Sequence, residues 1–130
     1  LTFTKQKVNH PYGKNPIGLL IYTNEGNMSG QVMNVERPVF TSDEKFNFGK
    51  DEEVRKAYEG YIAYYGKYEI NEKEKYVSHF VEGSLIPNWV GSTQIRYFEF
   101  DGNDKLILKT PPVLSGGAEF IVTLTFERVE

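Results

Sequence analysis

The sequence has 130 residues, a net charge of −3 and no cysteine. This length suits one domain with a core of its own, the acidic balance argues against a nucleic-acid partner, and the missing thiols exclude disulfides and thiol catalysis. No apolar run is long enough for a membrane helix, so we expect a single soluble domain over residues 1–130, in the cytoplasm rather than secreted after loss of a leader.

The first half of the chain predicts three strands and one helix. Residues 2–8 alternate weakly, while residues 17–23 and 28–35 flank a turn rich in Asn and Gly, as in a hairpin. Further along, three acidic residues precede apolar residues at helical spacing. This pattern indicates one short helix near residues 51–59, ended by Gly60.

The second half predicts five more strands, joined by turns rich in Gly, Asn, Asp and Pro. They cover residues 61–70, 76–83, 92–101, 105–110 and 118–129. Eight strands with short connections form an antiparallel meander, which has two free edges unless it closes on itself. We therefore predict an all-β fold, an eight-stranded antiparallel closed β-barrel that is either filled by side chains or holds one small ligand.

The alternation along each strand predicts which side chains point into the barrel, because successive residues face opposite sides of a sheet. In the last two strands the inward set is Leu106, Leu108, Phe120, Val122, Leu124, Phe126 and Arg128. In the three strands before them it is Ile62, Tyr64, Tyr68, Ile70, Val77, His79, Val81, Gln94, Arg96, Phe98 and Phe100.

Four polar side chains stand out in this apolar interior: Tyr64, His79, Gln94 and Arg96. Burying an unpaired Arg is costly, so these groups must satisfy one another or face water and a ligand. Apolar walls with a few convergent polar groups are typical of a small-molecule site. We therefore predict a ligand site at these four residues, with Trp89 at its mouth.

Structural roles remain open for the same residues. His79 can be a core histidine bonded to a tyrosine or a carbonyl, a ligand contact, or an acid–base group. Arg96 can pair with Glu82 or Glu99 instead of facing a pocket. Tyr22 is interpreted as core packing beside the first hairpin.

Motifs of catalysis and metal binding are scarce. The chain has no G-x-S-x-G, no phosphate-binding glycine loop and no H-E-x-x-H. The two histidines, His10 and His79, have neither a cysteine nor a neighbouring histidine to complete a zinc site. We expect no metal and no cofactor.

Several short motifs follow one another along nearly the whole chain. They are Pro11-Tyr12-Gly13, Pro16-Ile17-Gly18, Ile21-Tyr22-Thr23, Arg37-Pro38, His79-x-Val81-Glu82, Pro87-Asn88-Trp89-Val90-Gly91, Gln94-x-Arg96 and Leu106-x-Leu108-x-Thr110-Pro111-Pro112. In this order they resemble the lipocalin-like domain family of bacteria and fungi. The resemblance implies a closed antiparallel barrel with a pocket, and some fungal relatives resemble accessory proteins of secondary-metabolite pathways. The family usually opens with a Gly-x-Trp strand, and this chain starts after the place where that strand would lie.

The leading functional hypothesis is non-catalytic binding of a small hydrophobic or aromatic molecule, oriented by the polar residues and Trp89. One alternative is a barrel enzyme of isomerase or cyclase type, with His79 as acid or base, Tyr64 as hydrogen-bond donor and Arg96 stabilising negative charge. Another is a structural or interaction barrel whose polar interior satisfies itself. We expect no nucleic-acid or membrane partner, and a homodimer is left open.

Overall fold

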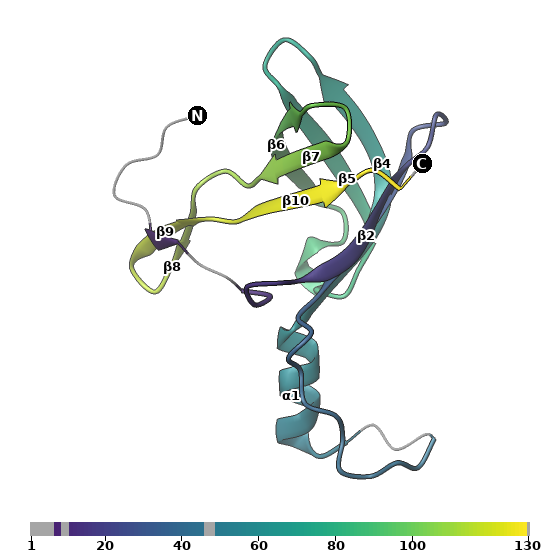
Figure 1. Ribbon diagram of the computed structural model, residues 1–130, viewed down its shortest axis with the longest axis vertical. Coiled ribbons are helices and arrows are strands. Elements are labelled where there is room, and N and C mark those ends of the chain that lie inside the picture. The colour runs from purple at the N-terminus through teal and green to yellow at the C-terminus, as the bar shows by residue number, and fades with distance from the viewer. Residues whose placement is uncertain (1–6, 9–10, 46–48, 130) are drawn as a thin grey trace.

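The computed structural model describes residues 7–8, 11–45 and 49–129 (Figure 1). Within these residues the chain is mostly β, with one α-helix and one short 3-10 helix. The strands are β1 (Lys7–Val8), β2 (Ile17–Tyr22), β3 (Asn27–Met33), β4 (Tyr61–Asn71), β5 (Tyr76–Ser84), β6 (Thr93–Asp101), β7 (Lys105–Lys109), β8 (Val113–Ser115), β9 (Ala118–Ile121) and β10 (Thr123–Glu127). The helices are α1 (Asp51–Glu59) and η1 (Pro87–Trp89).

Seven strands form one antiparallel sheet, in the order β10-β7-β6-β5-β4-β3-β2. The sheet curls into a nearly closed, lipocalin-like barrel, but the described parts of its end strands, β2 and β10, do not pair, which leaves a seam (Figure 1). β8, β9 and β1 form a second, three-stranded sheet. The predicted all-β meander is confirmed, and the prediction of eight strands closed into one barrel is wrong.

The seam arises because the predicted strand over residues 118–129 is in fact two strands. Val122 separates them: its N–H donates to the Thr110 hydroxyl, and its carbonyl accepts from the Thr110 N–H. β9 then pairs with β8 and β1 outside the barrel, so among the described residues no strand joins β10 to β2. Of the strand predicted at residues 2–8, residues 7–8 form β1 and residues 2–6 lie outside the described part of the chain.

The predicted helix forms as α1 and stands apart from the barrel, at the lower end of Figure 1. Its three acidic residues in the first turn suit the positive end of the helix dipole. Gly60 ends the helix, and a Cβ there would lie 2.5 Å from the Arg37 Cγ. Arg37 needs this space because its guanidinium donates to the Ala57 carbonyl (3.1 Å) and lies 5.1 Å from the Tyr61 ring centre.

The core follows the predicted alternation. In β5 the buried residues are Val77, His79 and Val81, separated by half-buried ones. The β7–β10 register sets Leu108 opposite Leu124, both on the predicted inward face. The expectation for Arg128 is wrong, because β10 ends at Glu127 and Arg128 is exposed.

Candidate ligand-binding site

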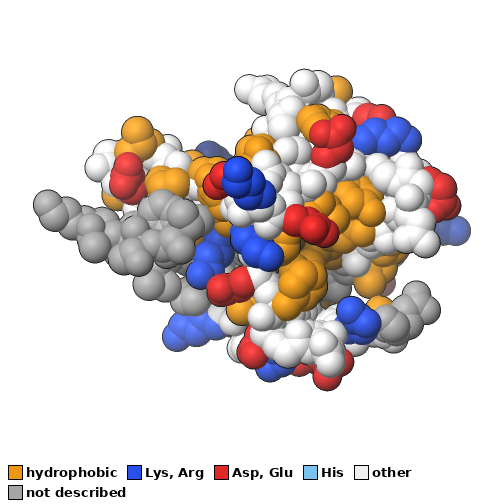
Figure 2. All heavy atoms as spheres, turned by 90° about the horizontal axis from the view of Figure 1, so that it is seen from above, with side chains coloured by type: hydrophobic (Ala, Val, Ile, Leu, Met, Phe, Trp, Pro, Cys, Tyr) orange, Lys and Arg blue, Asp and Glu red, His pale blue; other side chains and the backbone are white. Residues whose placement is uncertain are grey.

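A cavity of about 330 Å³ opens at the end of the barrel that carries the β4–β5 and β6–β7 turns. Figure 2 looks onto this end, where hydrophobic side chains gather in the centre and charged ones surround them. The volume falls within the range of about 300 to 1,000 Å³ typical of small-molecule sites. The cavity is lined by Tyr22, Tyr68, Ile70, Glu72, Lys75, Val77, Phe98, Phe100, Leu106 and Leu108.

A hydrogen-bonded triad of Tyr22, His79 and Tyr64 lies at the inner side of this cavity, which Tyr22 lines. The Tyr22 hydroxyl is 2.7 Å from the His79 Nε2, and the Tyr64 hydroxyl is 2.7 Å from the Nδ1. His79 is only 1% exposed. Burial, together with the nearby positive charge of Arg96, lowers the pKa of His79 to about 4, so the imidazole is neutral at physiological pH.

The two tyrosines of the triad stay protonated. Burial raises the pKa of both Tyr22 and Tyr64, and the positive charge of Arg96 only partly offsets this. Tyr68 holds Tyr22 in place, since their rings meet edge-on at 4.8 Å and the Tyr68 hydroxyl donates to the Thr23 carbonyl (2.7 Å). The triad is therefore a fixed set of neutral hydrogen-bonding groups.

Arg96 and Trp89 lie beyond the triad. The Trp89 ring meets the Tyr64 ring edge-on at 5.6 Å, and its centre is 6.0 Å from the Arg96 guanidinium carbon. Gln94 holds the loop that carries Trp89: its amide donates to the Ser92 hydroxyl, which donates to the Trp89 carbonyl. Gln94 thus supports the position of Trp89, while Trp89 and Arg96 face the triad.

The structure brings four of the five predicted site residues into one group: Tyr64, His79, Trp89 and Arg96. Gln94 pairs with His79 across β5 and β6 but bonds to Ser92. None of the five lines the cavity, and Tyr22 connects the two regions.

The suggested pairing of Arg96 with a carboxylate is wrong. Glu99 points to the outer face and pairs with Lys109 (3.5 Å), and Glu82 is exposed with no ion pair in the described part of the chain. The Arg96 guanidinium instead donates to the backbone carbonyl of its neighbour Ile95 (2.8 Å).

The predicted site left out Tyr12, Tyr22 and Tyr68, of which Tyr68 was expected on the inward face but not as a site residue. Tyr22 shares the inward face of β2 with Leu20, so the alternation that identified His79 could have found it. Tyr12 lies on the loop before β2, where burial raises its pKa and the positive charge of nearby Arg96 partly offsets this. No strand periodicity marks a loop residue of this kind.

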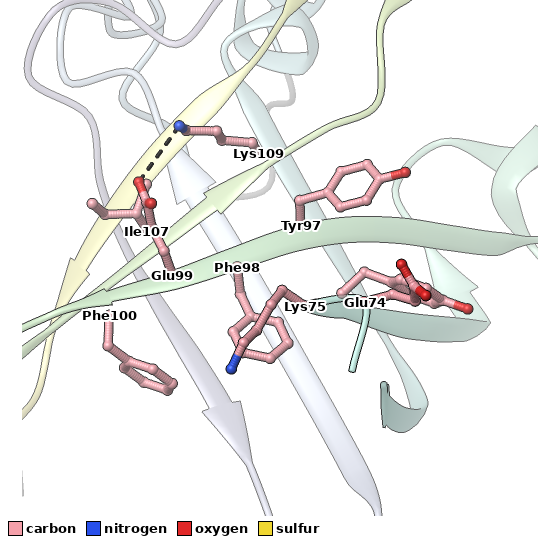
Figure 3. Close-up of a pocket in the computed structure, with 9 residues that line it drawn as sticks. Glu74, Lys75, Tyr97, Phe98, Glu99, Phe100, Ile107 and Lys109 are labelled. Carbon is pink, nitrogen blue, oxygen red and sulfur yellow. Dashed lines mark ion pairs between the residues drawn. The ribbon is translucent and has the colours of Figure 1, made fainter. Parts of the chain in front are cut away.

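A second, larger hollow of about 790 Å³ lies where β5 and β6 part, beyond their last pair, Tyr76 and Tyr97. It shares Lys75, Phe98 and Phe100 with the inner cavity. In Figure 3 the two phenylalanines extend to one side of β6, and Tyr97 and the ion-paired Glu99 lie on the other. The same stretch of β6 therefore borders both spaces.

The described residues lack two further features. They contain no helix that is long and apolar enough to cross a membrane. They also contain no group of three or more His, Cys, Asp or Glu side chains arranged to hold a metal ion.

Two comparisons with known proteins bear on this site. The model of a family described as a lipocalin-like domain matches residues 1–129. The chain is also 32% identical, over 108 residues, to the 4'-hydroxy-3'-methoxypropiophenone carrier protein of Aspergillus oryzae. This match covers 78% of the chain and 96% of the relative.

Proposed function

The chain belongs to the lipocalin-like domain family, and we propose that it binds a small, largely apolar or aromatic molecule inside its barrel and carries it without converting it. The single observation that carries this proposal is the cavity of about 330 Å³, which has mainly apolar walls. One of its lining residues, Tyr22, belongs to the neutral polar triad. Apolar walls supply affinity by removing ligand surface from water, and a few fixed polar groups orient the ligand.

The relative from Aspergillus oryzae is named as a carrier protein, and this supports a carrier role. The compound in its name is an aromatic ketone, and this supports an aromatic ligand. Phe98, Phe100 and Tyr68 give the cavity aromatic walls that suit a flat ring. We propose that a compound of this class occupies the space between these residues and the triad.

The state of His79 favours binding over acid–base catalysis. Both of its ring nitrogens are bonded to tyrosines, and its side chain is almost fully enclosed. A general acid or base works best with a pKa near the operating pH, whereas the pKa of His79 is lowered to about 4. A reacting atom would first have to displace one of the tyrosine hydroxyls.

The test is calorimetric titration of the protein with 4'-hydroxy-3'-methoxypropiophenone. Leu106→Trp places a larger side chain in the cavity, and we expect it to weaken binding at least tenfold. The matched control is Ile107→Trp, the next residue of β7, which lines the outer hollow and not the cavity. Circular dichroism and thermal unfolding verify that both variants fold.

Chromatography of the compound after incubation completes the test, and we expect to recover it unchanged. Equal binding by wild type and Leu106→Trp would place the ligand elsewhere and overturn the proposal. Conversion of the compound would overturn the non-catalytic part and favour the enzyme alternative.

A further inference from the structure

Arg96 places an uncompensated positive charge next to the cavity. It is the inward residue beside Phe98 on β6, and the register sets it opposite Val77 on β5. Phe98 and Val77 both line the cavity, so Arg96 lies just beyond its wall. No carboxylate in the described part of the chain pairs with it, since the ion pairs found there lie on α1 and on the outer face of the barrel.

The Arg96 side chain, which lies next to the cavity without lining it, keeps donors that no other described residue uses. One guanidinium nitrogen donates to the Ile95 carbonyl, and no other hydrogen bond of this side chain occurs among the described residues. Among the described residues, the one fully buried side-chain nitrogen that lacks a hydrogen-bond partner belongs to Arg37. The Arg96 nitrogens without a partner are therefore not fully buried. The neighbouring Gln94 is neutral and cannot offset the charge.

The triad adds one more free donor. A neutral imidazole has one N–H and one bare nitrogen, so it donates to one tyrosine hydroxyl and accepts from the other. The hydroxyl that accepts from His79 keeps its own hydrogen, whichever of Tyr22 and Tyr64 it is. Neither hydroxyl has a second partner within the described residues. The triad and Arg96 therefore offer donors and positive charge but no negative charge. The carboxylate that lines the cavity, Glu72, lies with Lys75 in the turn between β4 and β5.

We propose that this side of the cavity recognises an aromatic ligand by an ionised oxygen, a phenolate, with Arg96 as its counter-charge and the free hydroxyl of the triad as a second donor. The inference rests on the proposed function and adds the chemical class of the ligand. A phenolate spreads its charge over the ring, which suits apolar walls better than a compact carboxylate does. On binding, the ligand phenol releases its proton to the solvent.

The groups around Arg96 do not compete for that role. The charge of Arg96 acts on four titratable side chains with shifted pKa values: Tyr12, Tyr22, Tyr64 and His79. Burial raises the pKa of each tyrosine, so these hydroxyls stay protonated and can donate while a ligand phenol ionises. His79 stays neutral because its pKa is lowered to about 4.

The experiment compares two ligands of nearly equal size, 4'-hydroxy-3'-methoxypropiophenone and its methyl ether, 3',4'-dimethoxypropiophenone. Their Kd values are measured by calorimetry at pH values below and above the pKa of the free phenol. For wild type we expect the phenol to bind at least tenfold tighter at the higher pH and the ether to bind equally at both. The bound phenol should also show the long-wavelength absorption of a phenolate at a pH where the free compound does not.

Arg96→Gln should abolish the tightening and the phenolate absorption while leaving the Kd of the ether within about threefold, and Arg96→Lys should keep part of both. Arg55→Gln, on the exposed face of α1, is the matched control and should behave as wild type. If phenol and ether bind equally at each pH, or Arg96→Gln weakens both alike, the inference fails and the proposed function stands. If neither compound binds wild type, the proposed function fails, and this inference with it.

Discussion

The cavity end of the barrel interior and the polar side around His79 differ in exposure and in hydrogen bonding. The cavity end is lined mainly by apolar side chains, and some of them remain open to solvent: Phe100 is 64% exposed. The polar side holds His79, which is 1% exposed and has both ring nitrogens bonded to tyrosines. The cavity end keeps apolar surface that a ligand can cover. On the polar side, most hydrogen-bonding groups are bonded to other residues of the protein, and only a few donors stay free.

This contrast separates stability from affinity. Side chains whose partners are inside the protein stabilise the fold, and their loss leaves buried groups unsatisfied. Exposed apolar side chains contribute little to folding, but they gain free energy when a ligand covers them. We therefore expect substitutions in the triad to lower the free energy of unfolding, and substitutions at the cavity rim to lower ligand affinity.

The largest effect is expected for His79→Leu. Leucine cannot bond to Tyr22 or Tyr64, and each buried hydroxyl without a partner costs about 1–3 kcal/mol, so the free energy of unfolding should fall by roughly 2–6 kcal/mol. Urea denaturation measures this loss. The triple variant Tyr22→Phe/His79→Leu/Tyr64→Phe removes both hydroxyls and should recover most of it. A triple variant no more stable than His79→Leu would contradict the internal role of the triad.

The second prediction concerns pH and the same histidine. The unfolded chain protonates His79 near pH 6.5, whereas the folded protein keeps it neutral until about pH 4. Stability from this group is therefore complete above pH 6.5, and about 3 kcal/mol of it is lost as the pH falls from there to about 4. The measurement is the free energy of unfolding of wild type minus that of His79→Gln at each pH, which cancels the carboxylates common to both. A difference independent of pH would show that His79 titrates normally in the fold.

Alternation along single strands predicted much of this site. It placed His79 between Val77 and Val81, and Arg96 beside Phe98, on inward faces, and the structure agrees. Such predictions succeed because facing depends only on local pleating. The helix was equally predictable, since its acidic first turn and Gly60 are local signals.

Features that depend on distant partners were not predictable. The hydroxyl of Tyr22 meets a histidine 57 residues away, so nothing near Tyr22 in the sequence distinguishes this contact from ordinary packing. The break at Val122 has the same origin, because apart from Ile121 the alternation runs through residues 119–127, while the bonds of Val122 go to Thr110, 12 residues away. β8 was not predicted because two prolines precede it and two glycines form the turn between it and β9, a composition typical of a loop.

The smallest effect on stability is expected for Phe100→Ala. This variant tests whether residues of the cavity end contribute to ligand affinity rather than to stability. Because the ring is largely exposed, the free energy of unfolding should change by less than about 0.5 kcal/mol, while the Kd for 4'-hydroxy-3'-methoxypropiophenone should rise several-fold. The matched control is Glu99→Ala, the neighbouring residue on the outer face, whose exposed ion pair with Lys109 is worth about 0–1 kcal/mol. This control should leave the Kd unchanged. A large loss of stability in Phe100→Ala with no change in Kd would mean that the rim stabilises the fold rather than contacting the ligand, and the division between the two sides would fail.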